Sequence, residues 1–217
     1  MNTITNKIIH HGLADRPLTV SQLKRMVDGS AQSRYNLVNR AINSGELIRL
    51  QRGLYILNDR FRNHPCHPFV LAQAIAPGSY ISFETSLAHH GWIPEAVFTT
   101  ASVVPGRKSR QFEHETMGIF HFYPLAVHKL SFLELISRHT INNQTILLAK
   151  PLRALTDLIC HRKLSWEGMD WLSNGLRIEA ESLATITRKD IEILKSAYRH
   201  ERVKSFISHL SWELGID

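Results

Sequence analysis

A run of polar side chains lies between residues 31 and 43, where the chain carries no acidic residue. Amide, hydroxyl and guanidinium groups of this kind hydrogen-bond to base edges and to phosphate oxygens in nucleic-acid complexes. The candidate contact residues in this run are Gln32, Ser33, Arg34, Asn36 and Arg40. Two further cations, Arg49 and Arg52, follow a few residues later. These residue types and spacings predict a surface that binds double-stranded DNA.

A second basic cluster, formed by Arg107, Lys108 and Arg110, follows the dipeptide Pro105-Gly106. A Pro-Gly dipeptide predicts a turn, so these side chains are expected at the surface. Two interpretations stay open. The cluster is a solubilising loop, or it contacts phosphate groups or an acidic partner.

Several common catalytic and metal-binding motifs are absent from the sequence. There is no G-x-S-x-G nucleophile elbow and no G-x-x-x-x-G-K-[ST] phosphate loop. The cluster at residues 64–67 contains two histidines and a cysteine, but a structural zinc site needs a second matching pair of ligands. His90, which precedes Gly91, is expected to be a cation near the carbonyl groups of a helix end. We therefore expect no enzyme activity, no metal and no cofactor.

Three segments have the apolar spacing of helices. Two of them come before the polar run, and the third contains it. The first extends from Ile4 to Leu13, with Ile9 on its apolar side, and the second is capped by Thr19 or Ser21. The third extends from residue 31 to residue 43, with Ser30 as its cap and Tyr35 on its apolar side.

Two short runs rich in residues that favour strands follow the third predicted helix. They cover residues 47–50 and 54–57, and Gly53 lies in the turn between them, as in a β-hairpin. Three helices followed by a hairpin is the order of a winged helix-turn-helix domain. In that fold the third helix enters the major groove and the hairpin, or wing, contacts the backbone. We place this DNA-binding domain at residues 1–60.

Residues 61–217 are predicted to form an α+β domain that ends in helices, so the whole chain belongs to the α+β class. Strands are expected at residues 98–104 and 118–123, and Ser82 is expected to cap a helix. A stripe of apolar residues at helical spacing predicts a packed last helix. Its members are Val203, Phe206, Ile207, Leu210 and Leu214.

The composition is that of a globular protein: 43% of the 217 residues are hydrophobic and 21% are charged. The formal net charge is +7, and residues 1–60 carry +5 of it, which favours a polyanionic partner for this part. No apolar stretch approaches the roughly 18 residues of a membrane span. The N-terminus also lacks the apolar region of a secretory signal. We expect a cytoplasmic protein that does not contact membranes, with Cys66 and Cys160 as reduced thiols.

Three segments, in this order, resemble the AbiEi antitoxin family. Residues 44–55, SGELIRLQRGLY, are similar to its G-x-L-x-R-x-x-R-G-x-Y wing. Residues 80–92 are similar to a strand-to-helix segment that ends in a His-Gly pair, and residues 149–158 to a helix start of the form A-x-P-x-x-A-L-x-D-L. The resemblance implies a bacterial transcriptional regulator that represses its own operon. It also implies the antitoxin half of a type IV toxin-antitoxin pair, which counteracts a nucleotidyltransferase toxin.

Three hypotheses for the function follow from the sequence. The first is a regulator that binds operator DNA. The second is a protein-interaction module that uses the winged helix without DNA, and the third is a DNA-processing enzyme with an unrecognised site in the C-terminal part. The sequence does not decide the oligomeric state.

Overall fold

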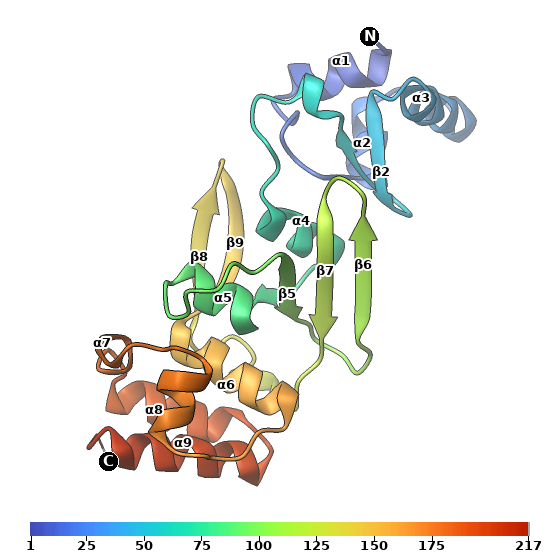
Figure 1. Cartoon of the computed structure of the whole chain (residues 1–217). Helices are drawn as coiled ribbons and strands as arrows, with labels where there is room; N and C mark the ends of the chain where they lie inside the picture. The colour runs from blue at the N-terminus through green and yellow to red at the C-terminus, as the bar shows by residue number, and fades with distance from the viewer. Residues whose placement is uncertain (217) are drawn as a thin grey trace. The chain divides into compact units, whose positions relative to one another are not determined.

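The computed structural model describes residues 1–216 and has a mixed α+β architecture with helices near both ends (Figure 1). The chain forms two compact units. The first comprises Met1–Pro77 together with Thr140–Gln144, and the second comprises Gly78–His139 together with the chain from Thr145 onward. The expected domain boundary at residue 60 therefore lies inside the first unit. No helix within residues 1–216 has the length and hydropathy needed to cross a membrane.

The first unit contains four α-helices and a small antiparallel sheet among its described residues. The helices are α1 (Thr3–His10), α2 (Val20–Met26), α3 (Ala31–Asn43) and α4 (Pro68–Ile75). The strands are β1 (Leu18–Thr19), β2 (Leu47–Gln51) and β3 (Leu54–Leu57), in the order β1-β3-β2. The bounds predicted for α3 are confirmed, and so is the hairpin that follows it.

Helix caps explain where α2 and α3 begin. The Thr19 hydroxyl accepts a hydrogen bond from the Gln22 amide, and the Gln22 side chain accepts one from the Thr19 amide, which completes a capping box. Ser30 caps α3 by accepting from the Ser33 amide at 3.2 Å. The connection from α2 to α3 is short, because only residues 27–30 lie between the end of α2 at Met26 and the start of α3 at Ala31.

The core of the first unit is apolar and lies between the helices and the sheet. Its most buried members are Ile4, Ile8, Leu18, Leu23, Ala41, Leu47 and Leu57. The expectation that Ile9 and Tyr35 face this core is wrong, because they are 39% and 62% exposed. Helix α1 contacts α2 and α3 through Ile4 and Ile8, so the adjacent Ile9 is turned away from both.

The second unit is built on a sheet with helices packed against it. The strands are β4 (Tyr80–Ile81), β5 (Thr99–Val103), β6 (Arg110–His114), β7 (Gly118–Tyr123), β8 (Ile136–Ile141) and β9 (Gln144–Ala149). Their order in the sheet is β6-β7-β5-β4-β9-β8. The tip of the β8–β9 hairpin, Thr140–Gln144, is the part that belongs to the first unit. The helices are α5 (Phe83–His89), α6 (Pro151–Arg162), α7 (Ala180–Leu183), α8 (Arg188–Ala197) and α9 (Glu201–Glu213).

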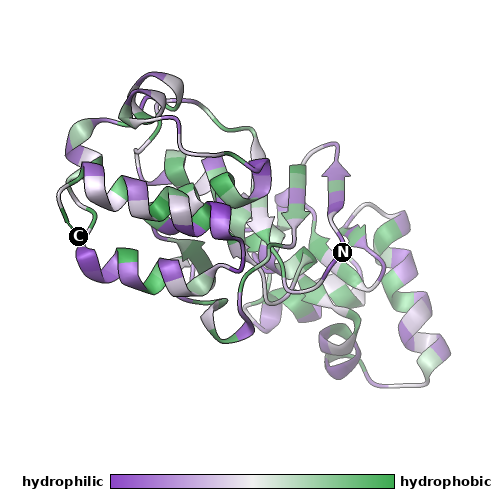
Figure 2. Cartoon of the chain, turned by 90° about the horizontal axis from the view of Figure 1, so that it is seen from below, coloured by the Kyte–Doolittle hydropathy of each residue, from purple (hydrophilic) through white to green (hydrophobic). Residues whose placement is uncertain are grey.

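The C-terminal helices pack through the predicted apolar stripe. Val203, Phe206, Ile207 and Leu210 are buried in α9, and Leu214 is half-buried just after it. Figure 2 shows hydrophobic and hydrophilic residues alternating along these helices, as expected where one side of each helix is covered. Helix α9 contacts both α6 and α8, so the last helix belongs to the core of the second unit.

Candidate nucleic-acid interface

Helix α3 presents most of its polar candidates to solvent. Gln32, Ser33, Asn36 and Arg40 are all exposed. The Gln32 side-chain amide donates to the Asn36 side-chain oxygen at 3.1 Å, which aligns the two amides on one side of the helix. Arg40 continues this side one turn further on. The structure therefore brings these four residues together on one exposed surface, which we call the α3 face.

Arg34 is placed differently from the residues of the α3 face. It is half-buried and lines an apolar cavity of about 240 Å³ between α2 and α3, together with Lys24 and Tyr35. Its Nε atom is buried and has no hydrogen-bond partner among the described residues. Arg34 thus borders the groove between the two helices rather than the α3 face.

The β2–β3 hairpin carries the other two arginines. Arg49 lies on β2, opposite Tyr55, and Arg52 lies in the turn; both are exposed. Gly53 adopts a φ of +83°, a conformation that favours glycine, and its carbonyl accepts from the Val20 amide at 2.9 Å. The tip of the hairpin is therefore attached to the start of α2.

The electrostatic setting of these arginines is positive. Within residues 1–216, no ion pair involves Arg40, Arg49 or Arg52. Glu46 is the one carboxylate between residues 29 and 58, and its side chain is buried. It accepts from the Asn2 amide at 2.7 Å, and this hydrogen bond is the main cause of its lowered pKa. Glu46, three residues after α3, is thus bonded to the N-terminus of the chain, and Asp28, three residues before α3, lies 4.0 Å from the Lys7 ammonium group.

The second basic cluster belongs to the second unit. Arg107 and Lys108 lie in the loop between β5 and β6, as the Pro-Gly turn predicted, and both are exposed. Arg110 begins β6, where its guanidinium group lies 4.8 Å from the centre of the Phe122 ring. The three cations therefore do not share one environment.

A buried polar network in the second unit was not anticipated from the sequence. Arg153 and Asp157 of α6 are fully buried, with Arg153 Nε 3.1 Å from Asp157 Oδ1. Asp157 also accepts from the Tyr80 hydroxyl at 3.1 Å, the Ser82 hydroxyl at 2.6 Å and the Tyr198 hydroxyl at 2.5 Å. Ser82 therefore bonds to Asp157, and its expected role as the side-chain cap of α5 is wrong.

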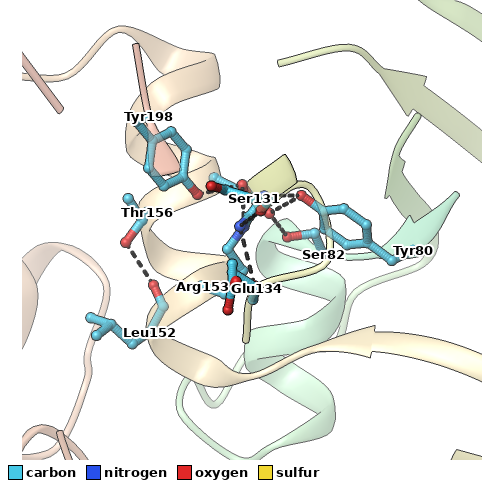
Figure 3. Close-up of polar contacts among 9 residues, drawn as sticks. Tyr80, Ser82, Ser131, Glu134, Leu152, Arg153, Thr156 and Tyr198 are labelled. Atoms are coloured by element: carbon cyan, nitrogen blue, oxygen red, sulfur yellow. Dashed lines mark hydrogen bonds and ion pairs between the residues drawn. The ribbon is translucent and has the colours of Figure 1, made fainter. Parts of the chain in front are cut away.

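The guanidinium group of Arg153 makes hydrogen bonds beyond the one to Asp157. Figure 3 shows it next to Tyr80, and it donates to the Tyr80 hydroxyl and to the carbonyl groups of Ser131 and Glu134. Burial raises the pKa of both Tyr80 and Tyr198, so their hydroxyls stay protonated as donors. Because its members are buried and bonded to one another, this network holds α6, β4 and the segment before α9 together.

His90 does not act as a cation at the end of α5. Burial is the largest influence on its pKa, which is lowered, and Nε2 lies 3.0 Å from the Ala149 carbonyl oxygen. The ring is therefore neutral near pH 7.

Cys66 and Cys160 are free thiols, and burial raises the pKa of Cys66 to about 11, so this thiol is a poor nucleophile.

No protein-family model matches this sequence, and no curated protein matches it closely enough to indicate a relationship. The AbiEi resemblance therefore stays a prediction from its three segments.

Proposed function

We propose that the first unit is a winged helix-turn-helix module that binds double-stranded DNA, with α3 in the major groove and the β2–β3 hairpin as the wing. The observation that carries this proposal is the exposed, acid-free α3 face next in sequence to two unpaired arginines, Arg49 and Arg52. The alternation of helices and strands and the short connection from α2 to α3 support it.

The α3 face suits base recognition. Gln32, Asn36 and Arg40 are spaced four residues apart, so they lie along one side of the helix over about 12 Å. Side-chain amides of this type pair with adenine edges and guanidinium groups with guanine edges in the major groove. Arg49 and Arg52 supply the positive charge that binds backbone phosphates and carries no sequence information.

The biological role that we propose rests on the resemblance to the AbiEi family. The protein is a cytoplasmic transcriptional regulator that represses its own operon by binding, without catalysis. The second unit then supplies the antitoxin function against a nucleotidyltransferase toxin. Growth rescue by the full chain, when it is expressed with the product of the neighbouring gene, tests this part of the proposal.

A second candidate function is favoured by one observation. Tyr35 is 62% exposed and lies at the cavity between α2 and α3, whose other lining residues include Val20, Leu23 and Val38. An exposed aromatic ring beside an apolar groove is typical of protein contacts. If the module binds a protein instead of DNA, this groove is where we expect the contact.

Salt dependence of binding separates the two functions. DNA binding releases counterions, so the logarithm of the binding constant falls linearly with the logarithm of the salt concentration. We expect Arg49→Gln and Arg52→Gln in the full chain each to reduce the magnitude of that slope by about 0.9, on promoter and random DNA alike. Fluorescence anisotropy with labelled duplexes over a range of salt concentrations measures it.

The charge-matched control for this experiment is Arg188→Gln. Arg188 lies on α8 in the second unit and is 69% exposed, so the substitution removes one surface charge that is not part of the first unit. Its slope should equal that of the unmodified protein. Equal slopes in all four proteins would remove the hairpin from the DNA interface.

A further inference from the structure

A cavity of about 670 Å³ in the second unit is not used by the proposed function. Its wall is formed by the loop that follows β5, the segment that follows β7, and Arg199 in the connection from α8 to α9. The apolar part of the wall consists of Val104, Pro105, Leu125, Val127 and Phe132. A volume of this size is in the range of small-molecule sites.

Three cations from three separate segments line the same cavity. They are Arg107 from the loop after β5, Lys129 from the segment after β7, and Arg199 from the α8–α9 connection. Among residues 1–216 none of them forms an ion pair, and no carboxylate lines the cavity. Three uncompensated charges that border one cavity repel each other, and an anion with several charges relieves this repulsion.

The wall that carries two of these cations is held in place by the fold. Val127 and Tyr198 form an antiparallel bridge, and the Arg199 amide donates to the Ala126 carbonyl at 3.0 Å. The Tyr198 hydroxyl is bonded to the buried Asp157. Arg199 and Lys129 therefore project from a backbone that is fixed from both sides, which lowers the entropic cost of binding a ligand between them.

We propose that this cavity binds an organic polyphosphate that carries a flat aromatic ring system, the chemistry of a nucleoside triphosphate. Arginine guanidinium groups match phosphate oxygens in geometry and charge, and three cations suit a group with three or more negative charges. The apolar wall would contact the faces of the aromatic base. A DNA backbone phosphate contacts exposed cations but does not fill a cavity with apolar walls, so a duplex fits this site less well.

Isothermal titration of the full chain with adenosine triphosphate tests the proposal, with inorganic tripolyphosphate and adenosine as partial ligands. We expect adenosine triphosphate to bind most tightly, since it alone uses both the cations and the apolar wall. Arg107→Gln and Arg199→Gln should each weaken its binding by about 5- to 10-fold, as expected for loss of a charge-assisted hydrogen bond.

Lys108→Gln is the matched control, because Lys108 is exposed in the same loop as Arg107 but does not line the cavity. It should change the affinity less than twofold. The proposal is overturned if adenosine triphosphate does not bind at concentrations up to about 5 mM, a very weak affinity. It is also overturned if Lys108→Gln weakens binding as much as Arg107→Gln, or if tripolyphosphate binds as tightly as the nucleotide.

A measurement of duplex DNA binding distinguishes this site from the proposed α3 interface. The double variant Arg107→Gln/Arg199→Gln should lose nucleotide binding and keep its affinity for duplex DNA within about twofold at a fixed salt concentration. An equal loss of duplex and nucleotide binding would show that the cavity contacts the DNA backbone instead. Variants of the α3 face should bind the nucleotide normally, so failure of one proposal does not imply failure of the other.

Discussion

Two arginine–carboxylate pairs with the same helical spacing illustrate how burial decides what an ion pair contributes to the free energy of unfolding. Arg153 and Asp157 on α6 have no exposed side-chain surface, whereas Arg188 and Glu192 on α8 are 69% and 64% exposed. Removing one partner of a buried pair leaves an uncompensated charge, which costs several kcal/mol. An exposed pair is screened by water and contributes little.

We expect Asp157→Ala to destabilise the second unit by about 3–5 kcal/mol, and Glu192→Ala by less than about 1 kcal/mol. Tryptophan fluorescence during denaturant unfolding measures both, because all four tryptophans, Trp92, Trp166, Trp171 and Trp212, belong to the second unit. Similar losses in the two variants would show that the α6 network does not stabilise the core as described.

At the scale of elements, Asp15 connects two loops of the first unit. Its carboxylate accepts from the Asn63 amide at 2.6 Å and from the His64 amide at 3.2 Å. Burial raises the pKa of Asp15, but these hydrogen bonds outweigh it and the pKa is lowered overall. A carboxylate with a lowered pKa contributes stability above its unfolded pKa and loses it as the pH falls through the folded value.

Amide hydrogen exchange at Asn63 and His64 should therefore be slow above about pH 4, relative to the intrinsic rate, and lose protection as the pH falls below it. Asp15 is half-buried and partly screened by water, so its contribution to global stability stays below about 1 kcal/mol. Asp15→Asn should flatten the pH dependence of protection at both amides. Unchanged pH dependence in this variant would assign the protection to another group.

The elements that the sequence predicted best are those with local signals. The Ser30 cap, the apolar spacing and the polar run located α3 to the residue, and Gly53 located the hairpin turn. Strand β6 was missed because it lies at the edge of the sheet and carries charged residues in place of an apolar run. The β8–β9 hairpin had one usable signal, the pair Asn142-Asn143, whose residues both adopt positive φ.

Local sequence patterns also predicted only part of the candidate site. Periodicity placed Gln32, Asn36 and Arg40 on one side of α3, as the structure does. It could not show that Arg34 turns toward the groove between α2 and α3, because that depends on how the two helices pack. The Tyr80–Asp157 contact joins residues 77 positions apart, and no local pattern predicts such a pair.

At the scale of the whole molecule, charge is divided unequally between the parts of the chain. Residues 1–60 carry +5 of the net charge of +7, and they include the α3 face and the hairpin. The remaining residues are nearly balanced but gather three unpaired cations around one cavity of the second unit. This distribution is the basis of the two proposals, that the first unit binds duplex DNA and that the second binds a small polyphosphate.

The most direct test of the central claim is the affinity of the full chain for a duplex from its own promoter, compared with a scrambled duplex at the same salt concentration. If the α3 face reads bases, Asn36→Ala and Arg40→Ala should each cost about 1–3 kcal/mol on the promoter, roughly 5- to 150-fold in affinity. Both variants should bind the scrambled duplex almost as well as the unmodified protein. Equal losses on the two duplexes, or no loss on either, would contradict the assignment of α3 as the reading helix.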